Sequence, residues 1–135
     1  MGLRIYDSTF FVDLDRERRR REHGCARALL SLHEKDELAM SVITRGELAR
    51  GFSERSRWEG FCSGFLILPI DDDVLWHAAS LFRTLRSAGT PISDNDLWIG
   101  ATALRHDLEL VTNNEDHFRH IPGLHICNHR AKPAG

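Results

Sequence analysis

The chain has 135 residues, of which 41% are hydrophobic, so it is long enough for one compact domain with a substantial core. Its net charge of −2 excludes a broad nucleic-acid-binding surface, although it leaves room for a local one. Three cysteines without paired spacing argue against a disulfide framework and favour a reduced, cytoplasmic setting. We see no signal peptide and no apolar run of membrane-spanning length, and therefore expect no membrane association. We expect a single domain over residues 1–127 and a flexible tail over residues 128–135.

The first predicted strand, residues 3–7, ends on Asp7, directly before an apolar helical segment. An aspartate at such a junction is commonly a helix cap or a turn residue. It is alternatively a ligand at the carboxyl end of a parallel strand, where open α/β sheets place their sites. Position alone leaves both interpretations of Asp7 open.

A single helix is predicted over residues 16–32, and it begins with the most basic run of the chain, Arg16–Arg21. Four consecutive arginines point around a helix and cannot all contact one ligand. A solvated face is therefore favoured over an RNA-phosphate contact. The role of this run stays open.

The second strand is predicted over residues 38–43 and is followed by Thr44-x-x-Glu47, the pattern of a capping box that opens a helix. Glu47 therefore has a structural interpretation as well as a functional one. Residues 54–64 suggest a short helix. The apolar run at residues 65–69 predicts a third strand in a central position of the sheet.

Three adjacent aspartates, Asp71–Asp73, come before a strongly periodic helix. Adjacent side chains diverge on a helix, so we interpret them as a cap and as charges that complement the helix dipole, rather than as a metal site. The buried face of that helix is predicted to contain Leu75, Ala78, Phe82 and Leu85.

The segment Gly89–Leu104 opens another helix, with Ser93 as N-cap and negative charge in the first turn. Ser93-x-x-Asp96 matches a capping box, in which Asp96 would bond back to the chain. Asp96 is alternatively a metal-binding carboxylate at a helix N-terminus. The fourth strand is predicted over residues 108–112, and a short edge strand over residues 124–127.

Strands and helices alternate along the chain, which predicts an α/β fold: a central, mostly parallel sheet of four to five strands with helices on both faces. Asp7, Glu47 and the loop at residues 112–116 each lie just beyond a strand, and Asp96 begins the helix before the fourth strand. One carboxylate cluster accounts for all three acids, whereas three separate capping explanations would otherwise be needed. Carboxylates at close range repel one another without cations, and hard cations such as Mg²⁺ or Mn²⁺ prefer oxygen ligands.

At this point the chain resembles a PIN-domain ribonuclease, and most of all the VapC-type toxins of bacterial toxin–antitoxin pairs. The resemblance covers nearly the whole chain. Its motifs are Asp7–Thr9, Ser41–Gly51, Gly89–Leu104 and Val111–Leu124. It implies a PIN-like fold, an RNA substrate, a homodimer, and a small antitoxin that wraps the toxin and places a basic side chain near the acids.

The resemblance also implies the roles of individual residues. Asp7, Glu47 and Asp96 match the metal-binding acids of the family, and Thr9 and Thr112 match positions close to the metal. The family has a fourth acidic or amide position after the fourth strand. That place holds Asn114 here, with Asp116 two residues on, so the residue that completes the site is either of the two.

The implied reaction is metal-assisted hydrolysis of an RNA phosphodiester by an activated water. No serine or cysteine of the chain is a convincing covalent nucleophile, because none has a recognisable base beside it. The alternative is a PIN-like binding module whose acids hold a partner's arginines in a DNA-associated complex, with little or no catalysis. The presence of all three acids, Asp7, Glu47 and Asp96, favours the interpretation as an enzyme.

Overall fold

The computed structural model describes residues 2–131. Five parallel strands form one sheet in the order β3-β2-β1-β4-β5. The strands are β1 (Leu3–Tyr6), β2 (Glu37–Ser41), β3 (Leu66–Leu68), β4 (Leu110–Thr112) and β5 (Ile126–Asn128). The parallel α/β sheet predicted from the alternation of elements is therefore confirmed.

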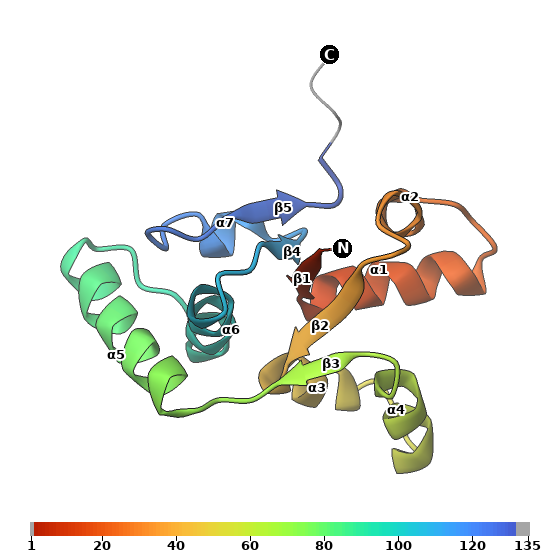
Figure 1. The fold of residues 1–135 in the computed structure, drawn as a ribbon, viewed down its shortest axis with the longest axis horizontal. Coiled ribbons are helices and arrows are strands. Elements are labelled where there is room, and N and C mark those ends of the chain that lie inside the picture. Colours follow the sequence, from red (N-terminus) through yellow and green to blue (C-terminus); the bar gives the residue numbers. More distant parts are fainter. Residues whose placement is uncertain (1, 132–135) are drawn as a thin grey trace.

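Seven helices occur in the described part of the chain. They are α1 (Ser8–Arg19), α2 (Cys25–Leu32), α3 (Val42–Ala49), α4 (Arg55–Cys62), α5 (Asp72–Ser87), α6 (Asp94–Arg105) and α7 (Glu115–Phe118). Figure 1 shows α5 and α6 on one side of the sheet, with α1 and α2 on the other. None of the helices within residues 2–131 has the length and apolar character needed to cross a membrane.

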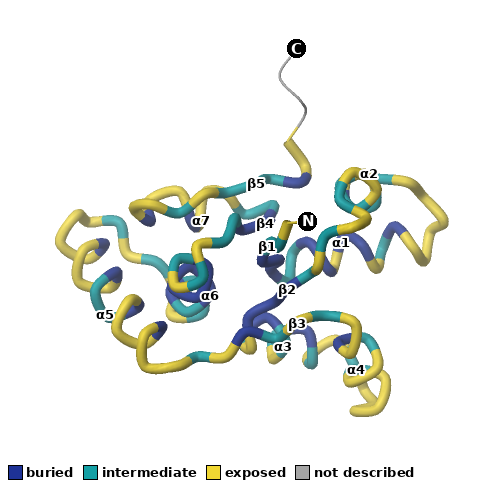
Figure 2. Tube along the Cα trace, in the orientation of Figure 1, coloured by how far each residue is buried: buried dark blue, intermediate teal, exposed yellow. Residues whose placement is uncertain are grey.

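Two hydrophobic clusters lie on opposite faces of the sheet, because successive side chains of a strand point to opposite sides. Ile5 belongs to the cluster that packs against α5 and α6, and its neighbour Tyr6 belongs to the cluster under α1. Leu110 and Val111 divide between the two clusters in the same way. Figure 2 shows that the buried residues gather on the strands and on the inner sides of the helices. A sheet covered on both faces needs apolar residues at successive positions, as its short strands have.

The predicted helix over residues 16–32 is wrong, because the structure divides this region into α1 and α2. Arg21 has a φ of 52°, a left-handed conformation that ends the first helix. The carboxylate of Glu17 then accepts hydrogen bonds from the backbone N–H groups of Gly24, Ala26 and Arg27 and so caps α2. A Cβ atom at residue 24 would lie 2.7 Å from the carboxyl carbon of Glu17, so a larger residue there would displace the carboxylate from this capping position.

Two further predictions about packing are corrected. β3 lies at an edge of the sheet and not in a central position. The buried residues of α5 are Val74, Ala78, Leu81 and Leu85, whereas Leu75 and Phe82 are exposed. The cap interpretation of the three aspartates holds, since the side chain of Asp71 accepts from the N–H of Val74.

Asp13 holds the C-terminal part of the described domain in place through hydrogen bonds. Asn128 belongs to β5, and the next two residues, His129 and Arg130, both contact the buried carboxylate of Asp13. These three residues of the predicted tail are therefore part of the folded domain. Residues 132–135 lie outside the described part of the chain.

Candidate active site

Asp7 lies at the carboxyl end of β1 and is also the N-cap of α1. Its side chain is buried, with the residue 4% exposed, and both oxygens accept hydrogen bonds. Oδ1 accepts from the backbone N–H and the hydroxyl of Thr9, at 3.0 and 2.5 Å, and Oδ2 accepts from the hydroxyl of Thr112 at 2.5 Å. The capping and functional interpretations of Asp7 are thus compatible, because one carboxylate caps the helix and faces the sheet edge.

The hydroxyls of Thr9 and Thr112 connect Asp7 to the loop after β4. The backbone N–H of Asn113 donates to the Thr9 hydroxyl at 3.0 Å, and that of Asn114 donates to the Thr112 hydroxyl at 2.9 Å. Since each hydroxyl oxygen accepts from the loop, its proton is left to point at Asp7. The orientation of the carboxylate is therefore fixed from two sides.

Glu47 lies in the second turn of α3, and the predicted capping box at Thr44 is wrong. The helix begins at Val42 with Ser41 as its N-cap, because the Ser41 hydroxyl accepts from the N–H of Ile43. Oε2 of Glu47 accepts a hydrogen bond from the amide of Asn95 at 3.4 Å. Oε1 of Glu47 is buried and has no hydrogen-bond partner among residues 2–131. A buried carboxylate oxygen without a donor is costly and calls for a positive charge or a water.

Asp96 lies in the first turn of α6, where Ser93 is the N-cap as predicted. The Ser93 hydroxyl accepts from the N–H of Asp96, whereas no reciprocal bond from the Asp96 carboxylate is found in the described residues. Oδ2 of Asp96 lies 3.2 Å from Nδ1 of His117 instead. The side chain of Asp96 is thus free of the capping role that its spacing suggested.

The two candidates for the fourth position lie differently. Asn114 lines the same pocket as the three acids. Asp116 has an 80% exposed side chain, pairs with Arg119 at 2.9 Å, and lines a neighbouring pocket together with Asp96. Of the two candidates, Asn114 is therefore the one that lines the pocket together with Asp7 and Glu47.

One pocket of about 370 Å³ at the carboxyl edge of the sheet brings the predicted acids together. Asp7, Glu47 and Asp96 line it, and so do Thr9 and Asn114. Burial raises the pKa of Asp7, although hydrogen bonds from the threonine hydroxyls oppose the rise. Burial also raises the pKa of Glu47, opposed by the bond from Asn95, and the negative charges of Asp7 and Asp96 raise it further. The pocket therefore gathers carboxylates whose burial and mutual repulsion disfavour their ionised forms.

The oxygen donors of this pocket suit a hard divalent cation, although their side chains do not point at one common position. Among residues 2–131, no three histidine, cysteine, aspartate or glutamate side chains are close enough to form a ready metal site. The donors that line the pocket are carboxylate and amide oxygens, which suit Mg²⁺ or Mn²⁺. The unpartnered Oε1 of Glu47 points to the same conclusion. We infer that Asp7, Glu47 and Asp96 would hold the cation after small side-chain movements.

The sequence analysis did not predict two residues of the pocket that contact the acids. Asn95 holds Glu47, and His117 contacts Asp96. Asn95 was detectable in principle, since it neighbours Asp96 in the first turn of the same helix. His117 carries no such signal, because α7 approaches α6 only through the tertiary fold.

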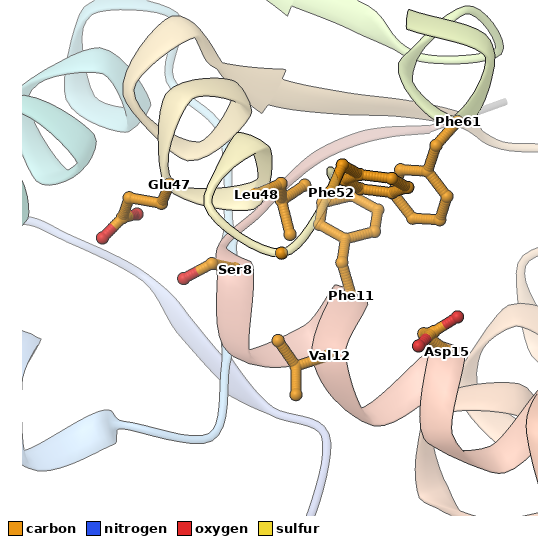
Figure 3. A pocket seen from close by; sticks show the side chains of 9 residues that line it. Ser8, Phe11, Val12, Asp15, Glu47, Leu48, Phe52 and Phe61 are labelled. Carbon is orange, nitrogen blue, oxygen red and sulfur yellow. The ribbon is translucent and has the colours of Figure 1, made fainter. Parts of the chain in front are cut away.

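An apolar groove of about 310 Å³ adjoins the acids between α1, α3 and α4. Figure 3 shows Glu47 and Ser8 at one end of this groove and the rings of Phe11, Phe52 and Phe61 at the other. A chain segment with apolar side chains and one basic side chain at its end would match both parts. The groove thus has the character of a peptide-binding surface.

Comparisons with known proteins identify the family and the fold of the chain. The family model for the PIN domain matches residues 5–124. Ribonuclease VapC19 of Mycobacterium tuberculosis is 33% identical over 126 residues, which cover 90% of this chain and 97% of that protein. The structure of VapBC-1 from nontypeable Haemophilus influenzae matches with a TM-score of 0.78 and 26% identity, covering 96% of this chain and 100% of that one. A toxin–antitoxin complex from Klebsiella pneumoniae matches with a TM-score of 0.71 and 27% identity, covering 93% and 97% of the two chains.

Proposed function

This chain belongs to the PIN-domain family, and from that membership we propose that it is a divalent-metal-dependent endoribonuclease, the toxin of a type II toxin–antitoxin pair. A relative that is 33% identical over nearly its whole length is named a ribonuclease, and structures similar over nearly the whole chain are toxin–antitoxin complexes. The observation that carries the proposal is the pocket shared by Asp7, Glu47 and Asp96.

The proposed cofactor is Mg²⁺ or Mn²⁺, held by the three acids. When bound, such a cation lowers the pKa of a water molecule and offsets charge that develops on the phosphoryl oxygens. The chain's own contribution is position: Thr9 and Thr112 orient Asp7, and Asn95 orients Glu47. A water nucleophile has no need of the RNA 2′-hydroxyl, so we expect products with 5′-phosphate and 3′-hydroxyl ends.

The proposed protein partner is a small antitoxin whose chain lies in the apolar groove beside Glu47. The three phenylalanines of the groove would bury its apolar side chains, and a basic side chain would reach Glu47 at the acidic end (Figure 3). A cation-dependent enzyme is inhibited in this way, because the partner's positive charge takes the place that the cation needs.

We also propose that the protein is a homodimer that uses the outer face of α5. Three large apolar side chains are exposed on this helix, and the most exposed, Trp76, has 69% of its surface accessible. Leu75 and Phe82 are the other two. A second copy of the chain would cover a patch that a monomer leaves in water. We further propose that the protein acts in the cytoplasm.

The experiment that tests the activity is RNA cleavage by the purified protein with and without divalent cation. We expect cleavage with Mg²⁺ or Mn²⁺, loss of cleavage with a chelator, and 5′-phosphate ends on the products. Absence of cleavage at any cation concentration, together with tight antitoxin binding, would support the alternative of a binding module. Products with 2′,3′-cyclic phosphate ends would exclude a water nucleophile.

A further inference from the structure

Positive charge is concentrated at the end of α1 that lies away from the acids. Residues 16–27 include six arginines and two glutamates, a net charge of +4, whereas the whole chain has a net charge of −2. The rest of the chain therefore carries −6. Segregation on this scale sets up a local positive field on a protein that is acidic elsewhere.

Four of the six arginines have no acidic partner within residues 2–131, and we name them the arginine cluster: Arg18, Arg20, Arg21 and Arg27. The other two are paired with acids, Arg16 with Asp13 at 2.6 Å and Arg19 with Asp15 at 2.9 Å.

One of the two glutamates of this segment, Glu17, does not compensate the arginine cluster. The Glu17 carboxylate is occupied by the backbone N–H groups that begin α2. The run is bent between α1 and α2, and Arg18, Arg20 and Arg21 are exposed to solvent, as the predicted solvated face requires, with no acidic partner within residues 2–131.

A pocket of about 350 Å³ lies between α1 and α2 at this place. Arg18, Arg27 and His23 line it with Ser31, and Glu34 is the one acid among its lining residues. Arg27 is held there, because its guanidinium donates to the backbone carbonyl of Glu22 at 2.9 Å. Leu14 and Leu30 supply the apolar part of the lining. Guanidinium donors around one hollow suit a phosphate group.

The arginine cluster and the acid pocket are joined by a single helix. Asp7 caps the first turn of α1, and Arg18 lies in its last turn. At a rise of about 1.5 Å per residue, eleven residues correspond to about 16 Å along the helix axis. One strand of a duplex covers that length in about five nucleotides. An RNA that is cut at the acids can therefore reach the arginine cluster.

We propose that the arginine cluster binds the phosphate backbone of the RNA substrate, about five nucleotides or more from the cleaved bond. This inference rests on the proposed ribonuclease function. The acid pocket repels a polyanion, so a site that cuts RNA gains from phosphate binding elsewhere on the protein. Each phosphate that an arginine binds releases counterions and so makes the affinity dependent on salt. RNA long enough to span both places is bound more tightly than a short oligonucleotide.

The test compares Arg18→Gln/Arg27→Gln with wild type and with Arg55→Gln/Arg57→Gln as a matched control. The control removes the same charge from exposed arginines of α4, each paired with a glutamate. RNA of about 30 nucleotides is titrated at 50 and 200 mM salt, and removing one arginine that binds a phosphate lowers the salt slope by about 0.7 to 0.9. We therefore expect the affinity of wild type and control to fall about tenfold more than that of the cluster variant over this range. In cleavage, the KM of the cluster variant for this RNA should rise about tenfold with kcat changed less than twofold.

Thermal melting checks that each variant folds, and Arg18→Gln/Arg20→Gln replaces the first variant if it does not. An unchanged salt slope in a folded variant would overturn the proposal, and so would loss of antitoxin binding with RNA binding intact. If wild type cleaves no RNA and binds none, the proposed function fails. If wild type cleaves RNA and the cluster variant matches it in KM and salt slope, only the present inference fails.

Discussion

Nε2 of His129 lies 2.8 Å from Oδ2 of Asp13, although 116 residues separate the two in the chain. Arg130 and Asn113 donate to the same buried carboxylate. Burial alone would raise the pKa of Asp13, but the hydrogen bonds from Arg130, His129 and Asn113 outweigh it and hold the pKa well below its usual range. Asp13 of α1 thus binds residues 129–130 and the loop after β4.

Asp13→Asn should lower the free energy of unfolding by about 3 kcal/mol at pH 7, because it leaves the positive partners of a buried carboxylate uncompensated. An acid with a depressed pKa stabilises the fold above its unfolded pKa, and this stabilisation is lost as the pH falls toward the folded value. The difference between wild type and variant should therefore be constant above about pH 5 and shrink below about pH 4. Urea unfolding at several pH values measures it.

Asp15→Asn is the control for that series. Asp15 is exposed on the same helix and pairs with Arg19, so its replacement should cost less than about 1 kcal/mol. Equal effects of the two substitutions at every pH would show that the Asp13 network adds nothing to stability.

Glu47→Gln should stabilise the cation-free protein at pH 7, because burial and the charges of Asp7 and Asp96 disfavour the ionised carboxylate. The same substitution should remove the stabilisation that a cation provides to wild type, about 2.7 kcal/mol at a hundred times its dissociation constant. Melting curves with and without Mn²⁺ measure both effects. A variant that is less stable than wild type without cation, and equally stabilised by Mn²⁺, would contradict a metal-binding role for Glu47.

Asn114→Asp should tighten cation binding, because it adds a carboxylate to the pocket that already contains the three acids. Asp116→Asn should reduce activity less than Asp96→Asn, since Asp116 is exposed and paired with Arg119. Activity is titrated with Mn²⁺ for these three variants and for Asn114→Ala side by side. If Asp116→Asn is as damaging as Asp96→Asn, and Asn114→Ala has no effect, then Asp116 is the ligand.

Val12→Asp should weaken suppression by the antitoxin at least tenfold, because it puts a charge into the apolar groove beside the phenylalanines. Leu32→Asp is the matched control, since it adds the same charge to an exposed apolar position on α2, outside the groove and outside the proposed dimer face. Inhibition of RNA cleavage by increasing antitoxin measures the effect. If both substitutions weaken suppression equally, or neither does, the groove is not the antitoxin site.

Local signals in the sequence predicted most of what positions the site. Asp7 at a strand end, Ser93 as a cap and the three aspartates before α5 depend on neighbours within a few residues, and the structure has all of them as predicted. The box at Thr44 was wrong because Ser41, three residues earlier, provides the N-cap of α3. When one segment holds two candidate N-caps, the sequence does not show which of them begins the helix, because that depends on the packing around the segment.

The features that the sequence did not predict depend on distant contacts. The break between α1 and α2 relies on Glu17 reaching the backbone of residues 24–27, and the edge position of β3 depends on the pairing order of the whole sheet. His117 reaches Asp96 only because α7 folds back toward α6. Sequence spacing carries no information on such contacts, so the helix break, the position of β3 and the contact of His117 with Asp96 could not be predicted.

Three acids that act on one cation are central to the proposed reaction. Asp7→Asn, Glu47→Gln, Asp96→Asn and the triple variant should be compared with wild type in Mg²⁺-dependent RNA cleavage. Residues that act as a unit have effects that do not add. We expect each single substitution to lower the rate by at least about a hundredfold, and the triple variant to be little worse than the most damaged single one. Rates near wild type for two of the three single variants would contradict the shared site.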